Sequence, residues 1–224
     1  VCPVCHKDEA WAHAENPWVI ICGRQNACGE KTHIKDLYSD LFESWSDRYE
    51  SSETNPHAAA DAYMAFARGF DAARIAGWYS QGSIYKAQID AGSATVRFDL
   101  ACGAVWERII DRPHRFGKQK ANFIGQYAGH WWTAPNQDLV NAKEIWITEG
   151  CFDTIALLHH EVTSVAALSC NNYPEHALKA LATTCAEAGL GRPRLIWALD
   201  AGNAGEKFTK EWVKRSREAG WDAS

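Results

Sequence analysis

The sequence of 224 residues lacks the features that mark several classes of protein. It has no run of about 18 apolar residues, the length that a membrane span needs. It has no basic start followed by an apolar stretch and a small-residue cleavage site, the pattern of a secretory signal. With 46% hydrophobic and 23% charged residues, its composition excludes disordered, collagen-like and coiled-coil proteins. We expect a globular protein without membrane contact, with one large domain or two to three small ones.

The sequence also lacks an excess of positive charge, but its charges are unevenly distributed. The net charge of −5 gives no indication of a nucleic-acid partner. Acidic residues dominate positions 35–61, whereas positions 97–120 are mainly basic, with Arg97, Arg108, Arg112, Arg115, Lys118 and Lys120. Aromatic residues alternate with the basic residues in this segment, and Trp131 and Trp132 follow it. Such a surface suits single-stranded nucleic acid, because the cations can bind phosphates and the rings can stack on bases. The alternative is that the tryptophans belong to the core and the charges to exposed strand faces.

The eight cysteines fall into two groups. One group is clustered at the start of the chain and opens with a Cys-x-x-Cys pair: Cys2, Cys5, Cys22 and Cys28. The other group is scattered through apolar segments and is expected to be buried as small hydrophobic residues: Cys102, Cys151, Cys170 and Cys185. A clustered quartet in a chain without a secretory signal indicates metal ligation rather than disulfides. We therefore expect a reducing, cytoplasmic compartment.

Residues 1–33 have the layout of a zinc ribbon, in which two cysteine pairs on turns flank a short hairpin. Four thiolates satisfy the tetrahedral preference of structural Zn²⁺, so Cys2, Cys5, Cys22 and Cys28 are the expected ligands. His6 and His33 are alternative ligands, and unligated buried thiols are the alternative to a metal site.

Residues 34–140 are expected to form an α+β region. Apolar residues at helical spacing predict an amphipathic helix over 33–50, at Leu37, Leu41 and Trp45. After a linker at 51–56, a second helix is predicted over about 57–75, ending near Gly77, with a core face of Tyr63, Phe66, Phe70 and Ala73. Alternating apolar and polar residues predict a β-hairpin with strands at 94–100 and 105–111.

Residues 141–224 alternate between strand and helix patterns. Strands are predicted at 144–148, 163–168 and 194–199, and helices at 151–160, 174–187 and 204–219. This alternation predicts a parallel sheet with crossover helices, in which ligands bind beyond the carboxyl ends of the strands. Glu149 and Asp200 lie at two of those ends. The alternative role for each acid is to cap the helix that follows.

Two segments at these strand ends resemble the motifs of the TOPRIM domain: ITEGCFDTIALL (147–158) and ALDAGNAGEKF (198–208). That domain occurs in bacterial-type DNA primases, type IA and II topoisomerases and some nucleases. Together with the cysteine quartet, the segments VRFDLACGAVWERIID (96–111) and KQKANFIGQYAGHWW (118–132) resemble the TOPRIM-type primases of phages and mobile elements. The resemblance implies an α/β fold with an N-terminal zinc ribbon, a basic α+β subdomain and a Rossmann-like TOPRIM sheet.

The resemblance also implies roles for individual residues. Glu149 matches the motif glutamate, a general acid/base or metal-organising group, and Asp200 and Asp153 match the motif aspartates. These three acids would hold Mg²⁺ or Mn²⁺, which prefer oxygen ligands. The basic residues Arg97, Arg108, Lys118 and Lys120 would bind the template backbone and the triphosphate. Gly202 replaces the second aspartate of the Asp-x-Asp motif, either because a ligand is lost, with Asn203 as a weaker oxygen donor, or because the backbone requires glycine.

The implied function is a DNA primase that makes short RNA primers. Its partners would be a single-stranded DNA template, ribonucleoside triphosphates and a replicative helicase in cis or in trans. Gly202 favours the alternative of a non-catalytic TOPRIM protein of a mobile element that binds single-stranded DNA. A third interpretation, a TOPRIM nuclease, is disfavoured by the ribbon and the basic subdomain.

Overall fold

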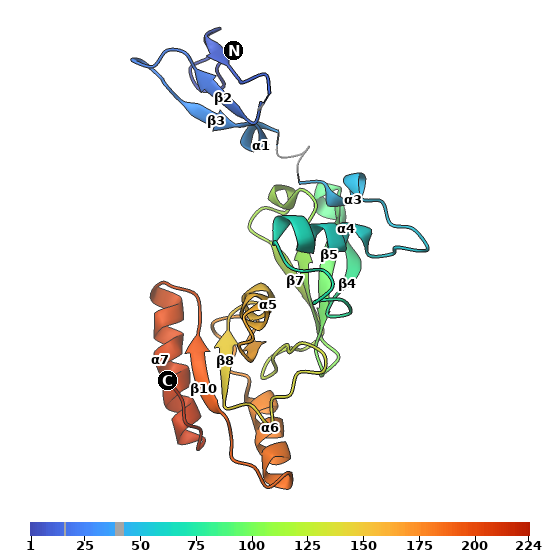
Figure 1. Cartoon of the computed structure of the whole chain (residues 1–224), viewed down its shortest axis with the longest axis vertical. Coiled ribbons are helices and arrows are strands. Elements are labelled where there is room, and N and C mark those ends of the chain that lie inside the picture. Colours follow the sequence, from blue (N-terminus) through green and yellow to red (C-terminus); the bar gives the residue numbers. More distant parts are fainter. Residues whose placement is uncertain (16, 39–42) are drawn as a thin grey trace.

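The computed structural model describes residues 1–15, 17–38 and 43–224, which form an N-terminal antiparallel sheet, a central antiparallel sheet and a C-terminal parallel sheet (Figure 1). Among the described residues, no helix is both long and apolar enough to span a membrane. The elements follow one another in the order β1 (Ala10–Trp11), β2 (Val19–Cys22), β3 (Lys31–His33), α1 (Ile34–Leu37), α3 (Trp45–Arg48), α4 (Ala58–Ala62), the π-helical turn η1 (Tyr63–Ala67), β4 (Ser80–Lys86), the 3-10 turn η2 (Ala87–Ile89), β5 (Ala91–Asp99), β6 (Val105–Ile109), the 3-10 turn η3 (Pro113–Phe116), β7 (Ala121–Ile124), β8 (Glu144–Thr148), α5 (Cys151–His159), β9 (Ser164–Ala166), α6 (Glu175–Glu187), β10 (Arg194–Ala198) and α7 (Asn203–Glu218).

The N-terminal sheet has β2 at its centre, paired antiparallel with β1 and β3. Among residues 1–15 and 17–33, the buried apolar side chains are Cys2 and Cys22, each 1% exposed. This unit therefore has its cysteines where a larger domain has an apolar core, as expected for a zinc ribbon.

The central sheet is an antiparallel meander in the order β4-β5-β6-β7. The predicted hairpin is confirmed: β5 pairs with β6, with Phe98 opposite Trp106. Strand β4 was not predicted because its sequence, SQGSIYK, is mostly polar and contains Gly82. A Cβ atom at Gly82 would lie 2.1 Å from Nε of Arg97, so this glycine lets the arginine cross the strand.

The predicted continuous helix over 33–50 is wrong. Helices α1 and α3 are four residues each, and Tyr38, Glu43 and Ser44 between them are not helical, while Leu41 lies outside the described residues. Helix α3 begins anew at Trp45 because the buried carboxylate of Asp111 accepts hydrogen bonds from the amides of Trp45 (2.6 Å) and Ser46 (3.0 Å). A side chain that lies just after β6 thus sets this helix start.

The second predicted helix is shorter than expected. It runs through α4 and η1 and ends at Arg68, because Gly69 adopts φ +71° and its amide donates to the carbonyl of Ala65 at 3.1 Å. Gly77 therefore does not end the helix, and Phe66 and Ala73 do not face the core: Phe66 is 71% exposed and Ala73 is also exposed.

The C-terminal sheet confirms the predicted alternation of strands and helices. Its strands are parallel and have the order β10-β8-β9. Backbone contacts cover both edges. Trp132 and Ala166 exchange two hydrogen bonds of 2.9 Å along β9, and the amide of Leu195 in β10 donates to the carbonyl of Asp222 at 2.8 Å.

One apolar core joins the central and C-terminal sheets. It combines Val96, Phe98 and Trp106 of the central sheet with Cys151 and Ile155 of α5, and Trp132 lies between them. Trp131 and Trp132 are 8% and 1% exposed, so these rings belong to the core and the interpretation of them as base-stacking platforms is wrong. Among the scattered cysteines, Cys151 and Cys185 are buried as expected, whereas Cys102 is exposed and Cys170 is half-buried.

Candidate metal centre and active site

The sulfur atoms of Cys2, Cys5, Cys22 and Cys28 all lie within 4.8 Å of one another. Cys2 Sγ is 3.9 Å from Cys28 Sγ, and Cys5 Sγ is 3.8 Å from Cys22 Sγ. A tetrahedral site with Zn–S bonds of about 2.3 Å has sulfur–sulfur edges of about 3.8 Å. The four cysteines are free thiols at distances far too long for disulfides, and this spacing fits a tetrahedral thiolate site.

Two turns hold these sulfurs together. After Cys2, the amide of His6 donates to the Cys2 carbonyl at 3.0 Å, and His6 adopts φ 56°. Around Cys28, the amides of Cys28 and Gly29 both donate to the carbonyl of Arg24, at 2.8 and 3.0 Å. His6 and His33 are not part of the cluster, so the alternative in which a histidine replaces a cysteine is not supported.

Glu149 and Asp200 lie at the same end of the C-terminal sheet, where the carboxyl ends of its parallel strands meet. Thr148, the last residue of β8, is in register with Ala198, the last residue of β10. Glu149 directly follows the first strand, and Asp200 follows the second after one residue. Asp153 lies in the first turn of α5, which is tied to the end of β8 by a hydrogen bond of 2.7 Å between the hydroxyls of Thr148 and Thr154.

Electrostatic repulsion links the three acids. Partial burial and then the charge of Asp200 raise the pKa of Glu149, while the amides of Cys170 and Asp200 partly oppose this effect. Burial and the charge of Asp200 likewise raise the pKa of Asp153. The carboxylate oxygens of Glu149, Asp153 and Asp200 are not all within 4.8 Å of one another, unlike the four sulfur atoms. A divalent cation between these carboxylates would relieve their repulsion, and carboxylate oxygens suit Mg²⁺ or Mn²⁺.

Helices α5 and α7 begin at this same end of the sheet, at Cys151 and Asn203. Their first amide groups have no partner within the helix, and the helix dipole favours anions there. This end of the sheet therefore combines carboxylates, which can hold a cation, with two helix N-termini, which favour phosphate groups.

Glycines bring these helices close to the acids. A Cβ atom at Gly205 would lie 1.8 Å from the carbonyl oxygen of Asp200, and one at Gly150 would lie 2.8 Å from Oδ2 of Asp153. Gly202 is different, because no atom lies within 4 Å of its Cβ position, but its backbone has φ 129° and ψ 172°. Only glycine adopts this conformation readily. The backbone explanation of Gly202 is therefore favoured over a simple loss of a ligand.

Arg68 is a functional candidate that sequence reasoning missed. Its guanidinium lies 4.1 Å from the ring centroid of Phe152, its Nε donates to the Tyr63 hydroxyl at 3.0 Å, and its charge opposes the rise in the pKa of Asp153. It directly follows η1 and precedes the first TOPRIM-like motif, which begins at residue 147, by 79 positions. The one signal in the sequence was a basic residue directly before a helix-ending glycine.

The four predicted nucleic-acid-binding residues occupy different environments. Arg97 Nε donates to Glu107 at 2.8 Å, and Glu107 is 1% exposed. Burial opposes ionisation of Glu107, but hydrogen bonds from Asn122, Arg97 and Thr95 outweigh it and lower the pKa of this carboxyl. Nε of Arg108 is buried without a hydrogen-bond partner, and Lys118 and Lys120 are exposed. Arg97 thus has a structural partner, whereas the two lysines are accessible to a ligand.

Comparisons with known proteins place this geometry in context. Residues 146–224 match the family described as Toprim-like. The crystal structure of the RNA polymerase domain of the Mycobacterium tuberculosis primase DnaG is similar over 84% of this chain and 72% of that chain, with a TM-score of 0.56 and 15% identity. The primase fragment of the bacteriophage T7 primase-helicase protein matches with a TM-score of 0.40 and 14% identity, over 95% of this chain and 83% of that chain. No curated protein matches the sequence.

Proposed function

We propose that this protein is a DNA primase that synthesises short RNA primers on single-stranded DNA. The main support is that Glu149, Asp153 and Asp200 lie together with two helix N-termini at the carboxyl end of a Toprim-like sheet. The fold shared with a primase RNA polymerase domain is consistent with this reaction. A phage or mobile-element origin stays a prediction.

In this proposal the three acids would hold Mg²⁺ or Mn²⁺, and the bound metal would neutralise the charge of the substrate phosphates and lower the pKa of the attacking 3′-hydroxyl. The amide groups that begin α5 and α7 favour the triphosphate of an incoming ribonucleotide. Arg68 adds positive charge on the side of Asp153. Reaction at the α-phosphate joins the two nucleotides and releases pyrophosphate.

The basic segment and the N-terminal ribbon would bring the template to the strand-end acids. Lys118 and Lys120 are exposed on the segment before β7 and would bind template phosphates, together with Arg108. The four cysteines would bind structural Zn²⁺, and the resemblance to zinc-ribbon primases suggests that the ribbon contacts the template. A replicative helicase, in cis or in trans, is the expected protein partner.

The test is incubation with single-stranded DNA, labelled ribonucleoside triphosphates and Mg²⁺ or Mn²⁺. The wild type should synthesise labelled primers, and Glu149→Gln and Asp200→Asn should each abolish this synthesis while DNA binding is retained. Glu144→Gln is the matched control, because Glu144 is an exposed glutamate at the opposite end of β8. Loss of synthesis in the control as well would argue against a local role of the strand-end acids.

The second candidate function is a single-stranded-DNA-binding protein without catalysis, which Gly202 favours because the motif aspartate is absent. The same assay distinguishes the two candidates. DNA binding without primers under either metal would support the second candidate, and shortened DNA would instead indicate a nuclease.

A further inference from the structure

The loop of residues 167–172 follows β9 and lies beside the strand-end acids. Because β8 is the central strand of its sheet, Glu149 at its end is flanked by the loops that follow β9 and β10. The amide of Ala167 donates to the carbonyl of Thr148, directly before Glu149, at 2.8 Å. The loop therefore begins next to the central acid of the candidate active site.

Cys170 of this loop is close to Glu149. Burial and the charge of Asp200 raise the pKa of Glu149, and the amides of Cys170 and Asp200 oppose that rise. Burial and then the charge of Glu149 raise the pKa of the Cys170 thiol. Glu149 thus interacts with one amide from each flanking loop, and both amides favour its ionised form.

The backbone of the loop is strained at Leu168. This buried residue has φ 72°, a conformation that a bulky side chain rarely adopts. Such a conformation persists only where the surrounding structure determines it, and it is found mainly at functional sites. Leu168 lies just after the chain leaves β9 and two residues before Cys170. Other contacts must therefore hold the course of the loop.

Two side chains supply these contacts. Asn172, which is buried, donates to the carbonyl of Ala167 at 2.7 Å and so joins the two ends of the loop. Trp212 of α7 is 6% exposed, and its indole Nε1 donates to the carbonyl of Cys170 at 2.8 Å. The second bond fixes the residue whose amide interacts with the central acid.

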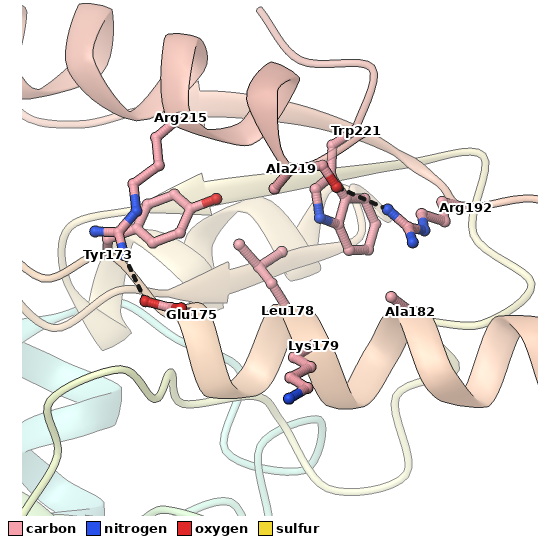
Figure 2. Close-up of a pocket in the computed structure, with 9 residues that line it drawn as sticks. All are labelled: Tyr173, Glu175, Leu178, Lys179, Ala182, Arg192, Arg215, Ala219 and Trp221. Atoms are coloured by element: carbon pink, nitrogen blue, oxygen red, sulfur yellow. Dashed lines mark hydrogen bonds and ion pairs between the residues drawn. The ribbon is translucent and has the colours of Figure 1, made fainter.

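The indole ring of Trp212 is itself held on several sides. Its centroid lies 5.4 Å from that of Phe208, on which it stacks, and 5.3 Å from that of Tyr173. The guanidinium of Arg215 lies 4.1 Å from the Tyr173 ring centroid and forms an ion pair with Glu175 (Figure 2). These contacts limit movement of the indole ring, so its N–H group keeps its direction toward the loop.

One face of α7 contacts both loops that flank Glu149. Gly205 and Trp212 are seven positions apart and both buried, which places them on the same face of the helix. Gly205 packs against the carbonyl of Asp200 in the loop after β10. Trp212 binds the loop after β9. The position of this helix is therefore transmitted to the carboxylate from both sides.

We propose that Trp212 is a positioning residue of the candidate active site. Its indole N–H holds the loop after β9 through the carbonyl of Cys170 and thereby orients the Glu149 carboxylate. An indole N–H is a donor only, so Trp212 acts through the loop and does not itself bind the metal. The proposal rests on the proposed function, in which Glu149 is one of the metal-holding acids.

The test is Mn²⁺ binding to the zinc-loaded full chain, followed by electron paramagnetic resonance. Trp212→Phe keeps an aromatic ring but removes the N–H donor, and it should weaken Mn²⁺ binding by about tenfold or more, as is usual when the support of a metal ligand is lost. Trp197→Phe is the matched control, because Trp197 is 5% exposed and its Nε1 donates to Ser216 rather than to the loop. The control should bind Mn²⁺ as the wild type does. Both variants lose one hydrogen bond of a buried indole, so they should have similar melting temperatures.

A double-mutant cycle tests whether Trp212 acts through Glu149. In Glu149→Gln, which keeps Asp153 and Asp200, addition of Trp212→Phe should cause little further loss of Mn²⁺ affinity. A second measurement is the Mn²⁺ concentration for half-maximal primer synthesis. It should rise in Trp212→Phe by the same factor as the dissociation constant, and saturating Mn²⁺ should restore most of the rate. A purely structural defect would lower the rate at every Mn²⁺ concentration.

Three results would overturn the proposal. They are unchanged Mn²⁺ affinity in Trp212→Phe, an equal loss of affinity in Trp197→Phe, and a full further loss when Trp212→Phe is added to Glu149→Gln. Failure of the proposed function gives a different result. Absence of Mn²⁺ binding by the wild type would refute the metal site and the positioning role together, whereas wild-type binding that Trp212→Phe leaves unchanged would refute the positioning role alone.

Discussion

Replacement of Gly205 with alanine should displace Asp200 from the strand-end site. The new Cβ atom would lie 1.8 Å from the carbonyl oxygen of Asp200 and 3.0 Å from its carbonyl carbon, and all three of the nearest atoms belong to the Asp200 backbone. Contacts of Cβ atoms below 3.0 Å essentially never occur, so α7 or the segment after β10 must move by at least about 1.2 Å. No flexible side chain is available to absorb this movement.

This movement has an expected cost in function and in stability. Misplacement of a catalytic group by about 1 Å reduces a rate by about 100-fold. Overpacking in a well-packed region costs about 1–3 kcal/mol. For a chain of this size each kcal/mol lowers the melting temperature by about 2–4 °C, so we expect a decrease of roughly 2–12 °C.

The assays are thermal denaturation followed by circular dichroism, Mn²⁺ binding followed by electron paramagnetic resonance, and primer synthesis. Gly191→Ala is the control, because no atom lies within 4 Å of its Cβ position and its backbone does not require glycine. We expect the control to match the wild type in all three assays. If Gly205→Ala melts at the wild-type temperature and binds Mn²⁺ with unchanged affinity, the close contact of α7 with Asp200 does not position the acid.

Three further outcomes are expected. Freshly purified protein should contain about one zinc ion per chain by metal analysis, and Cys22→Ser should lose it and unfold residues 1–33, because a unit with so few buried side chains depends on the metal; a zinc-free wild type would contradict this. Because the pKa of Glu149 is raised in the folded state, its ionisation destabilises the metal-free fold at pH 7, so Glu149→Gln should raise the melting temperature there by a few degrees. That gain should disappear as the pH falls below 4.5, the ordinary pKa of the group, where the wild-type carboxyl is neutral in both states; a gain independent of pH would refute the reasoning. Replacement of Lys118 and Lys120 by alanine should reduce the salt slope of single-stranded DNA binding by about 1.4, at about 0.7 per phosphate contact, and an unchanged slope would show that the DNA lies elsewhere.

The C-terminal region could be predicted from the sequence because its signals are local. The apolar strand Glu144–Thr148 and the helices that follow the strands have patterns that do not depend on distant residues. The arrangement of Glu149 beside Asp200 then follows from the geometry of parallel strands, which requires only the strand order. The four cysteines were similarly predictable, because ligand spacing is a property of the sequence itself.

The remaining errors arise where a distant side chain decides the local structure. The amides of Trp45 and Ser46 bind Asp111, 65 or more positions away, so the periodicity of residues 33–50 did not reveal the helix start. Strand β4 is held by β5 rather than by its own polar sequence. Arg68 reaches the vicinity of Asp153 through tertiary packing on Phe152, for which a linear motif contains no signal.

The hydrogen bonds between Trp132 and Ala166 have a consequence for how this domain can be exchanged between proteins. Without Trp132, the outer edge of β9 would expose unpaired amides and carbonyls, and the face of α5 that carries Cys151 and Ile155 would lose its cover. An open strand edge beside an apolar face promotes association with other chains. A recombination event or an expression fragment that begins at residue 141 would therefore yield an aggregating product, whereas one that includes residues 130–140 would retain the edge cover, including the bond of 3.0 Å from Gln137 to the Ser164 carbonyl. The unit that evolution can move intact is thus longer than the segment that the Toprim-like family match defines.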